Sequence, residues 1–352
     1  MTPRVACTVV LTTLSLLGVE AQRPGREPLA RPIVDAHNCY TENGQWADRL
    51  SRALGTGARP IGIEQDLVWK PDGSGGGTSL VAHDPELVGG EPTLDDHFFK
   101  VVAPMLDAAL ATHDVSRWPL VVLHFDFKTN ETAHHQFVRT LLKKYERWLT
   151  YTTRGADDRV QPLTVGPLMV LTEAGENQQH DFYDVLPQGE KMTMFGTVPN
   201  VRLTDSKDKD VQADAAVTAP PATLLPTGAT NYRRWANFSW AIVERGGQTR
   251  AGDWDDIDNA RLQSLVERAH TLGLWLRFYT LDGFDPANNQ GWSTGYNFGS
   301  INAASQRWRA AINAGVDLIA TDQYEALSSE LARQQPRLLL DTLADARRHW
   351  LR

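Results

Sequence analysis

Short apolar runs alternate with helical patterns along most of the chain, and this alternation constrains the fold more than any other feature. Strands are predicted at residues 32–38, 61–69, 79–84, 120–128, 168–172, 191–196, 238–243, 274–281 and 316–321. Amphipathic helical patterns separate most of them, for example at residues 46–54, 131–150 and 257–272. Strands that alternate with helices indicate parallel βαβ units, and about eight such units predict an α/β fold, a single-domain TIM (β/α)8 barrel.

An open, doubly wound sheet is the alternative arrangement of such units. Nucleotide-binding sheets of that kind carry a glycine-rich loop between the first strand and the first helix. Here the run of three glycines at residues 75–77 falls between two predicted strands. The closed barrel is therefore the prediction, and a nucleotide site is not expected.

The middle of the chain lacks a clear pattern. Residues 197–235 contain a charged cluster at residues 205–210 and two prolines, Pro220 and Pro221, which predict a long loop or insertion. Loops on the catalytic face of a barrel vary to set specificity. We therefore expect this segment to shape the substrate pocket rather than the core, with an insertion remote from the site as the alternative.

The first residues predict a segment with a separate role. Arg4 precedes an apolar stretch at residues 5–18, and Ala21 then offers the small side chain typical of a cleavage site. The stretch is shorter than the roughly 20 residues that span a bilayer. We expect a secretory signal peptide at residues 1–21 and a secreted or periplasmic (extracytoplasmic) protein. An uncleaved anchor or a buried first helix is the alternative.

The remaining chain is expected to divide into three parts. These are a polar linker at residues 22–31, the barrel at residues 32–335 and a helical C-terminal tail at residues 336–352. The formal net charge is −8, without a block of like charge. Nucleic acid is not expected as a partner, because its binding needs a basic surface. The sequence leaves the oligomeric state open.

Polar residues at alternate positions of two predicted strands point most strongly to a function. Glu64 and Asp66 lie two apart on one strand, and the same spacing recurs at His124, Asp126 and Lys128 on another. Residues at i and i+2 of a strand face the same side, which in a barrel is the interior. Charges are costly there unless they are paired or bind a metal. The three carboxylates suit one divalent cation, Mg²⁺ or Ca²⁺, because these ions prefer oxygen ligands.

Two further histidines lie near the ends of predicted strands. His37 lies near the end of the first strand, and His83 lies near the end of the strand after the glycine run. An imidazole titrates near neutral pH, so both suit proton transfer. Simpler roles are the alternatives: His124 as a hydrogen-bonded core residue, and Asp84 and Asp322 as caps of following helices.

These motifs resemble the superfamily of glycerophosphodiester phosphodiesterases and phosphatidylinositol phospholipase C-like enzymes, and most closely its Aim6-like branch. The similarity is strong over residues 33–128, weaker over residues 257–327 and absent between them. The segments that show it are residues 35–40 (DAHNCY), 63–67 (IEQDL), 80–84 (LVAHD), 123–128 (LHFDFK), 279–282 (YTLD) and 315–322 (GVDLIATD).

The resemblance implies a TIM barrel with a phosphodiesterase site. Glu64, Asp66 and Asp126 correspond to the metal ligands of that family. His37 and His83 correspond to its acid and base. The implied activity is a metal-dependent hydrolysis of phosphoric diesters in which the two histidines transfer the protons.

Substrate contacts are implied for Asn38 and Lys128. The family usually has arginine directly after the first histidine, where this chain has Asn38. Lys128 would contact phosphate or hold the metal carboxylates. The third metal position is usually glutamate, and here it is the shorter Asp126. The implied partner is a small-molecule or lipid phosphodiester of glycerophosphodiester or phospholipid type, and a lipid substrate implies transient contact with a membrane surface.

Two other functions fit a barrel of this length. A carbohydrate-active hydrolase would use a carboxylate pair, with Trp292 and Tyr296 as a sugar platform. A noncatalytic binding protein on the same fold would not need His37 and His83 together. The first needs neither a metal triad nor paired histidines, and the second is disfavoured because the whole polar set is present.

Overall fold

The computed structural model describes Leu29 and residues 32–42, 44–112, 114–244, 252–283 and 298–334. The predicted signal peptide, almost all of the predicted linker and the predicted C-terminal tail lie outside these residues. Trp292 and Tyr296 also lie outside them. Within the described chain, no helix has the length and apolar character needed to cross a membrane.

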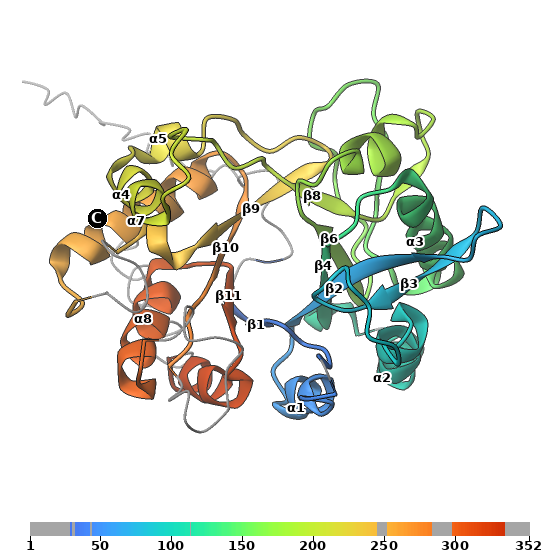
Figure 1. Ribbon diagram of the computed structural model, residues 1–352, viewed down its shortest axis with the longest axis horizontal. Helices are drawn as coiled ribbons and strands as arrows, with labels where there is room; N and C mark the ends of the chain where they lie inside the picture. Colours follow the sequence, from blue (N-terminus) through green and yellow to red (C-terminus); the bar gives the residue numbers. More distant parts are fainter. Residues whose placement is uncertain are drawn as a thin grey trace, which may run out of the picture.

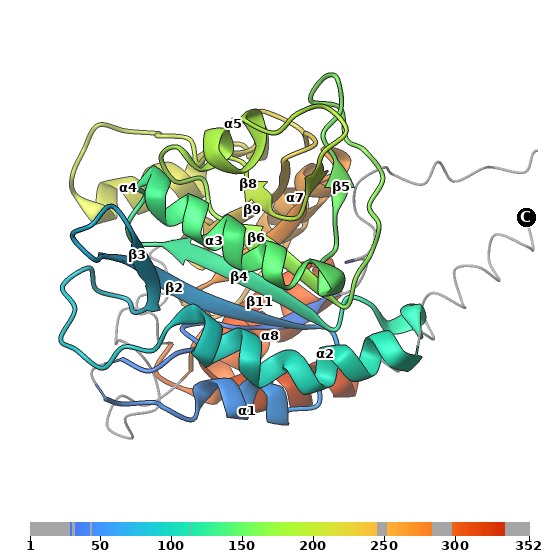
Figure 2. The same cartoon turned by 90° about the vertical axis from the view of Figure 1, so that its right-hand side faces the viewer.

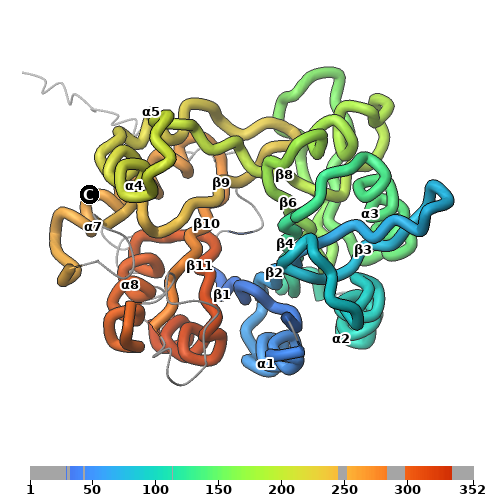
Figure 3. The backbone as a smooth tube through the Cα atoms, in the orientation of Figure 1, coloured from blue at the N-terminus to red at the C-terminus, as the bar shows by residue number. Residues whose placement is uncertain are grey.

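Eight parallel strands close into a barrel (Figure 1), which confirms the predicted TIM-barrel fold. The ring runs in the order β1-β11-β10-β9-β8-β6-β4-β2, and β2 pairs again with β1. Figure 3 shows the first and last strands, β1 and β11, side by side, where their parallel pairing closes the ring. The strands are β1 (Ile33–Ala36), β2 (Ile61–Pro71), β4 (Val121–Phe127), β6 (Leu168–Thr172), β8 (Phe195–Thr197), β9 (Arg233–Ser239), β10 (Trp275–Tyr279) and β11 (Leu318–Thr321).

Three short strands lie outside the ring. β3 (Gly77–Val81) pairs antiparallel with the end of β2, so the two form a hairpin that extends beyond the barrel (Figure 1). β5 (Thr152–Thr153) and β7 (Lys191–Met192) form a separate two-stranded sheet. The predicted strand at residues 191–196 is therefore two strands, and only β8 belongs to the barrel.

Helices surround the barrel and bury its outer face. Figure 2 shows α2 and α3 outside the strands β2 and β4. Side chains between the two layers form a continuous apolar core that includes Phe98, Leu106 and Val138. The helices are α1 (Arg49–Gly55), α2 (Lys100–Thr112) after a π-helical turn at Asp95–Phe99, α3 (Thr132–Lys144), α4 (Lys209–Thr218), α5 (Pro221–Leu224), α7 (Asp256–Thr271), α8 (Ile301–Ala314) and residues 324–334.

The structure corrects the prediction for the middle of the chain. Residues 197–235 are not a plain loop, because they include α4 and α5. The side chain of Asp208 accepts a hydrogen bond from the Asp210 backbone N–H and caps α4. The strand expected at residues 238–243 is wrong: β9 ends at Ser239, whose hydroxyl accepts from the Ala241 N–H and begins a 3₁₀ turn instead.

A buried histidine under the β2–β3 hairpin makes the stability of the fold sensitive to acid. The Nε2 atom of His134 lies 2.8 Å from the Ser79 hydroxyl, and Nδ1 lies 3.1 Å from the Thr129 carbonyl oxygen. A neutral imidazole satisfies both contacts, by accepting at Nε2 and donating at Nδ1. Burial lowers the pKa of His134 to about 4. In the folded protein His134 therefore stays neutral at pH values where the unfolded chain, with a histidine pKa of about 6.5, is already protonated.

We therefore expect acid to remove stability through His134. The folded pKa lies below the unfolded one, so the stabilisation is full above about pH 6.5 and is lost as the pH falls toward 4. At pH 5 the loss from this group is about 2 kcal/mol. Urea unfolding at pH 8 and pH 5 measures it: His134→Gln should lose about 2 kcal/mol less between these pH values than the native chain. An equal loss in both proteins would contradict this role of His134.

Candidate active site

The polar side chains of the neighbouring strands β2 and β4 meet at the C-terminal end of the barrel. Glu64 lies beside His124, and Asp66 lies beside Asp126, in the parallel register of the two strands. Carboxylate oxygens of Glu64, Asp66 and Asp126 all lie within 4.8 Å of one another. The three predicted metal ligands thus come together with the spacing of a single cation site.

One oxygen of Asp66 contacts three different side chains. Oδ2 accepts hydrogen bonds from the Tyr40 hydroxyl at 2.6 Å and from His83 Nδ1 at 2.8 Å, and it forms an ion pair with Lys128 Nζ at 2.8 Å. The other oxygen, Oδ1, is buried and accepts no hydrogen bond within the described chain. A buried carboxylate oxygen without a hydrogen-bond partner is costly, and such an oxygen is the kind of ligand that a hard divalent cation prefers. The donor set therefore fits Mg²⁺ or Ca²⁺.

Lys128 lies between two of the carboxylates. Its Nζ atom is 2.6 Å from Asp126 Oδ2 and 2.8 Å from Asp66 Oδ2. Burial alone would lower the pKa of Lys128, but the charges of Asp66 and Asp126 outweigh it and raise the pKa, so the ammonium stays charged. Burial, together with the charge of Asp66, raises the pKa of Asp126. Of the two roles implied for Lys128, the geometry shows the one that holds the carboxylates.

Glu64 is held in the ionised state by an arginine on the other side of the barrel. Its Oε2 atom lies 3.1 Å from Arg277 Nη2 on β10, and it accepts the Asn38 backbone N–H at 3.1 Å. Burial opposes ionisation, but Arg277 and His37 keep the pKa of Glu64 well below its usual range. A second carboxylate, Asp35 on β1, pairs with the Arg277 Nε atom.

A glycine makes room for this pair of charges inside the barrel. Gly62 lies beside Asp35 in the register of β1 and β2. A Cβ atom at Gly62 would lie 2.1 Å from Asp35 Oδ1, which is far closer than any contact allows. The Asp35–Arg277 pair, and with it the position of Glu64, therefore depends on the missing side chain.

His37 forms a dyad with an aspartate that follows the last strand. Its Nδ1 atom lies 3.0 Å from Asp322 Oδ1, and Arg49 Nη2 holds the other Asp322 oxygen at 3.1 Å. Its Nε2 atom lies 3.6 Å from Glu64 Oε2. Burial would lower the pKa of His37, but the charges of Glu64 and Asp322 outweigh it and raise the pKa to about 9.

Asn38 lies beside this dyad and is itself buried. Its Nδ2 atom is 2.9 Å from His37 Nδ1 and 3.3 Å from Asp322 Oδ1, and its Oδ1 atom lies 3.0 Å from the Tyr40 hydroxyl oxygen. Its backbone has a φ of 48°, a left-handed conformation that asparagine tolerates better than most residues. The side chain therefore ties the histidine dyad to the carboxylate cluster.

His83 is the more accessible of the two predicted proton-transfer residues. Its side chain is 43% exposed, against 8% for His37. Its Nδ1 atom contacts Asp66, and that hydrogen bond raises the pKa of His83. Donation from Nδ1 to Asp66 fixes the tautomer and leaves Nε2 for proton transfer.

The structure adds residues that the sequence analysis did not assign to the site. Tyr40, Asp322 and Arg49 position the predicted ligands and histidines, as do Asp35 and Arg277. Two sequence features could have indicated these residues. Arg277 and Tyr279 lie two apart on one strand and so face the same side, and Tyr40 lies three residues after His37 in the segment that resembles the family.

The simple alternative for His124 is wrong. His124 is fully buried, but neither ring nitrogen makes a hydrogen bond within the described chain. Asp322 does not simply cap a helix either, because it pairs with His37 and Arg49.

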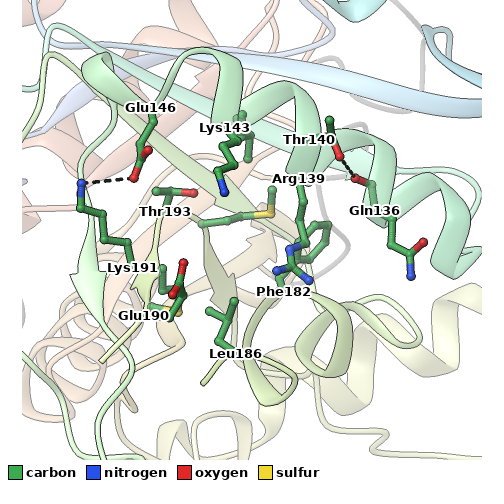
Figure 4. A pocket seen from close by; sticks show the side chains of 13 residues that line it. Gln136, Arg139, Thr140, Lys143, Glu146, Phe182, Leu186, Glu190, Lys191 and Thr193 are labelled. Atoms are coloured by element: carbon green, nitrogen blue, oxygen red, sulfur yellow. Dashed lines mark hydrogen bonds and ion pairs between the residues drawn. The ribbon is translucent and has the colours of Figure 1, made fainter. Parts of the chain in front are cut away.

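Three cavities have different relations to this site. One, of about 390 Å³, lies between α3 and residues 182–194, and no predicted site residue lines it. Figure 4 shows the side chains that line it. A second, of about 370 Å³, is lined by Asp126, Glu173 and Asn237. A third, of about 360 Å³, is bordered by Tyr279, whose ring stacks on His37. The second and third adjoin the cluster of carboxylates and histidines.

Comparisons with known proteins give similarity only at a low level. Neither a protein-family model nor a curated protein matches the chain. Among solved structures, a glycerophosphoryl diester phosphodiesterase from Parabacteroides distasonis is 12% identical, with 88% of this chain and 90% of that chain covered and a TM-score of 0.40. A dihydropteroate synthase from Burkholderia cenocepacia is 13% identical, with 93% and 97% covered and a TM-score of 0.37. The closed barrel is established by the strand pairing of this chain itself.

Proposed function

We propose that this protein is a metal-dependent phosphoric diester hydrolase. The observation that supports this best is the convergence of three carboxylates with two carboxylate-paired histidines at the C-terminal end of the barrel. Active sites of such barrels lie at this end. The sequence resemblance to glycerophosphodiesterases and phospholipase C-like enzymes adds the reaction class.

Glu64, Asp66 and Asp126 would hold one divalent cation, Mg²⁺ or Ca²⁺. When bound, such an ion neutralises phosphate oxygens and stabilises the charge that develops in the transition state. Lys128 pairs with both Asp66 and Asp126 and so holds the two carboxylates side by side. Arg277 pairs with Glu64 and lowers its pKa.

The two histidines would divide the proton transfers between them. With a pKa raised to about 9, His37 is protonated at neutral pH and suits the general acid that donates a proton to the leaving alkoxide. Asp322 holds its ring so that Nε2 faces the carboxylate cluster. His83, which is more exposed, suits the base that takes the proton from water or from a substrate hydroxyl.

The groove beside Tyr279 supports a substrate with an apolar part. It is lined by Val201, Leu203, Leu224 and Phe238 among others, and it includes residues of the 197–235 segment. Ser239 and Tyr279, which end β9 and β10, also line it, so this segment reaches the catalytic end of the barrel. We therefore propose a glycerophosphodiester or phospholipid-type substrate and transient contact with a membrane surface. An extracytoplasmic location is proposed separately, from the signal-peptide pattern at residues 1–21.

Phosphorus NMR tests the reaction class directly. The full chain is incubated with Mg²⁺ or Ca²⁺ and with a glycerophosphodiester or a lysophospholipid. We expect the diester resonance to disappear and a phosphomonoester or cyclic phosphate resonance to replace it. The identity of the product also shows whether water or a substrate hydroxyl attacks. Turnover of a glycoside substrate with every phosphodiester left intact would contradict the proposal.

A further inference from the structure

A second group of possible metal ligands lies next to the first. It consists of Glu64 on β2, His124 on β4 and Glu173, which directly follows β6. These strands are neighbours in the barrel. One potential ligand atom from each residue lies within 4.8 Å of the other two. The group shares Glu64 with the carboxylate triad, and it differs from the triad by offering an imidazole.

His124 is the residue that points to a missing ligand. Its Nδ1 atom lies 3.8 Å from Glu64 Oε1 and its Nε2 atom 3.3 Å from Glu173 Oε1, and neither makes a hydrogen bond within the described chain. Other buried histidines differ: His134 contacts Ser79, and His270 contacts Asp317 at 3.0 Å. A buried polar group without a hydrogen-bond partner destabilises the fold unless a ligand binds it.

The ring of His124 is nevertheless fixed in place. The indole of Trp235 packs edge-on against it, with the ring centroids 4.8 Å apart. Trp235 is itself anchored, because its N–H donates to the carbonyl oxygens of Thr172 and Phe195 at 3.1 Å. An imidazole that is fixed within 4 Å of two carboxylates, with no hydrogen bond at either ring nitrogen in the described chain, has the arrangement of a preformed ligand.

The local charge balance also favours a cation. Lys128 is bound by Asp66 and Asp126, and Arg277 is shared between Asp35 and Glu64. Glu173 forms no ion pair with a lysine or arginine of the described chain; its donor is the neutral Asn237 amide at 2.7 Å. The cavity of about 370 Å³ at Glu173 and Asp126 gives an ion a route of entry.

We propose that Glu64, His124 and Glu173 bind a second divalent cation, of the Zn²⁺ type. Imidazole suits Zn²⁺, whereas Mg²⁺ and Ca²⁺ prefer oxygen ligands. Glu64 then serves both ions, an arrangement found in two-metal sites, where the second ion supports the attacking or leaving oxygen. The inference rests on the proposed function because Glu64 is common to both sites.

Metal analysis of the full chain tests this second site. The protein is stripped with a chelator and dialysed against limiting Zn²⁺ in excess Mg²⁺, and both ions are then counted by mass spectrometry. We expect one Zn²⁺ per chain, with a nitrogen ligand visible in the zinc X-ray absorption spectrum. His124→Asn and Glu173→Gln should each lower the zinc affinity about 10-fold or more. His135→Asn is the matched control, because His135 is equally buried but lies on α3, outside the barrel.

The outcomes separate this inference from the proposed function. Zinc uptake that is unchanged in both site variants, with Mg²⁺-supported hydrolysis intact, overturns the second site alone. If the native chain binds neither Zn²⁺ nor Mg²⁺ and hydrolyses no phosphodiester, both the second site and the proposed function are overturned. If circular dichroism shows that His124→Asn is unfolded, Glu173→Gln decides, because the Glu173 side chain is 32% exposed and tolerates the change. Unchanged zinc affinity in that variant overturns the proposal.

Discussion

Replacing His37 with asparagine is expected to lower kcat by about 10²-fold or more. The reason is that neither a bound cation nor Lys128 can deliver the proton that the leaving group needs. Metal binding should persist, because the proposed ligands are carboxylates. His83→Asn is expected to have an effect of similar size, and the double variant should be little worse than the worse single one, since residues that act as one unit are not additive.

A substrate with a very good leaving group separates the two histidines. Such a group departs without a proton, so the variant that lacks the general acid should regain much of its rate. We expect rescue of His37→Asn and not of His83→Asn. His180→Asn is the control, because its side chain is 67% exposed and lies outside the site. If neither variant is rescued and both lose the metal, the histidines are ligands and their assigned roles are wrong.

Replacing Asp66 with asparagine is expected to have an even larger effect. The change removes the charge of one ligand and weakens three contacts at once, those with Tyr40, His83 and Lys128. Because a bound cation contributes several kcal/mol to the transition state, we expect turnover to fall by about 10³-fold or more. Isothermal titration with Mg²⁺ or Ca²⁺ should show that binding is lost as well.

An exposed aspartate provides the control for this experiment. Asp157→Asn makes the same chemical change at a residue that pairs with Arg159 on the surface, and it should leave both turnover and metal binding as in the native chain. Circular dichroism establishes that the Asp66→Asn barrel is folded. Unchanged metal affinity in a folded Asp66→Asn protein would show that Asp66 is not a ligand.

The barrel could be predicted because its strands and helices are encoded locally. Each strand is a short apolar run, and the period-two spacing of Glu64 and Asp66 identified the inward face of β2 before the structure showed it. The same spacing placed Asp126 beside Asp66. These predictions needed only the geometry of a strand and the cost of a buried charge.

Contacts between distant parts of the chain could not be predicted in this way. Asp35 and Arg277 are 242 residues apart, and Asp322 lies 285 residues from His37. Their partners follow from the closure of the ring, which brings β1, β10 and β11 together. Glu173 has no polar residue two positions before it, so the period-two pattern did not identify it. Its position beside His124 follows only from the pairing of β4 with β6.

The errors in the middle of the chain have a local physical cause. Residues 238–243 are apolar enough for a strand, but the Ser239 hydroxyl turns the backbone into a 3₁₀ helix. The charged run before α4 suggested a loop, although Asp208 is the cap that begins a helix. In both places one short polar side chain decided the conformation against the pattern of the surrounding residues.

The metal requirement of phosphodiester hydrolysis tests the central claim most directly. The full chain is stripped with a chelator and assayed with bis-p-nitrophenyl phosphate, before and after Mg²⁺ or Ca²⁺ is restored. We expect hydrolysis to be absent from the stripped protein and to return with the added ion, since Glu64, Asp66 and Asp126 are placed to bind a cation at this end of the barrel. Full hydrolysis in the presence of the chelator, or none with any divalent ion, would contradict the account.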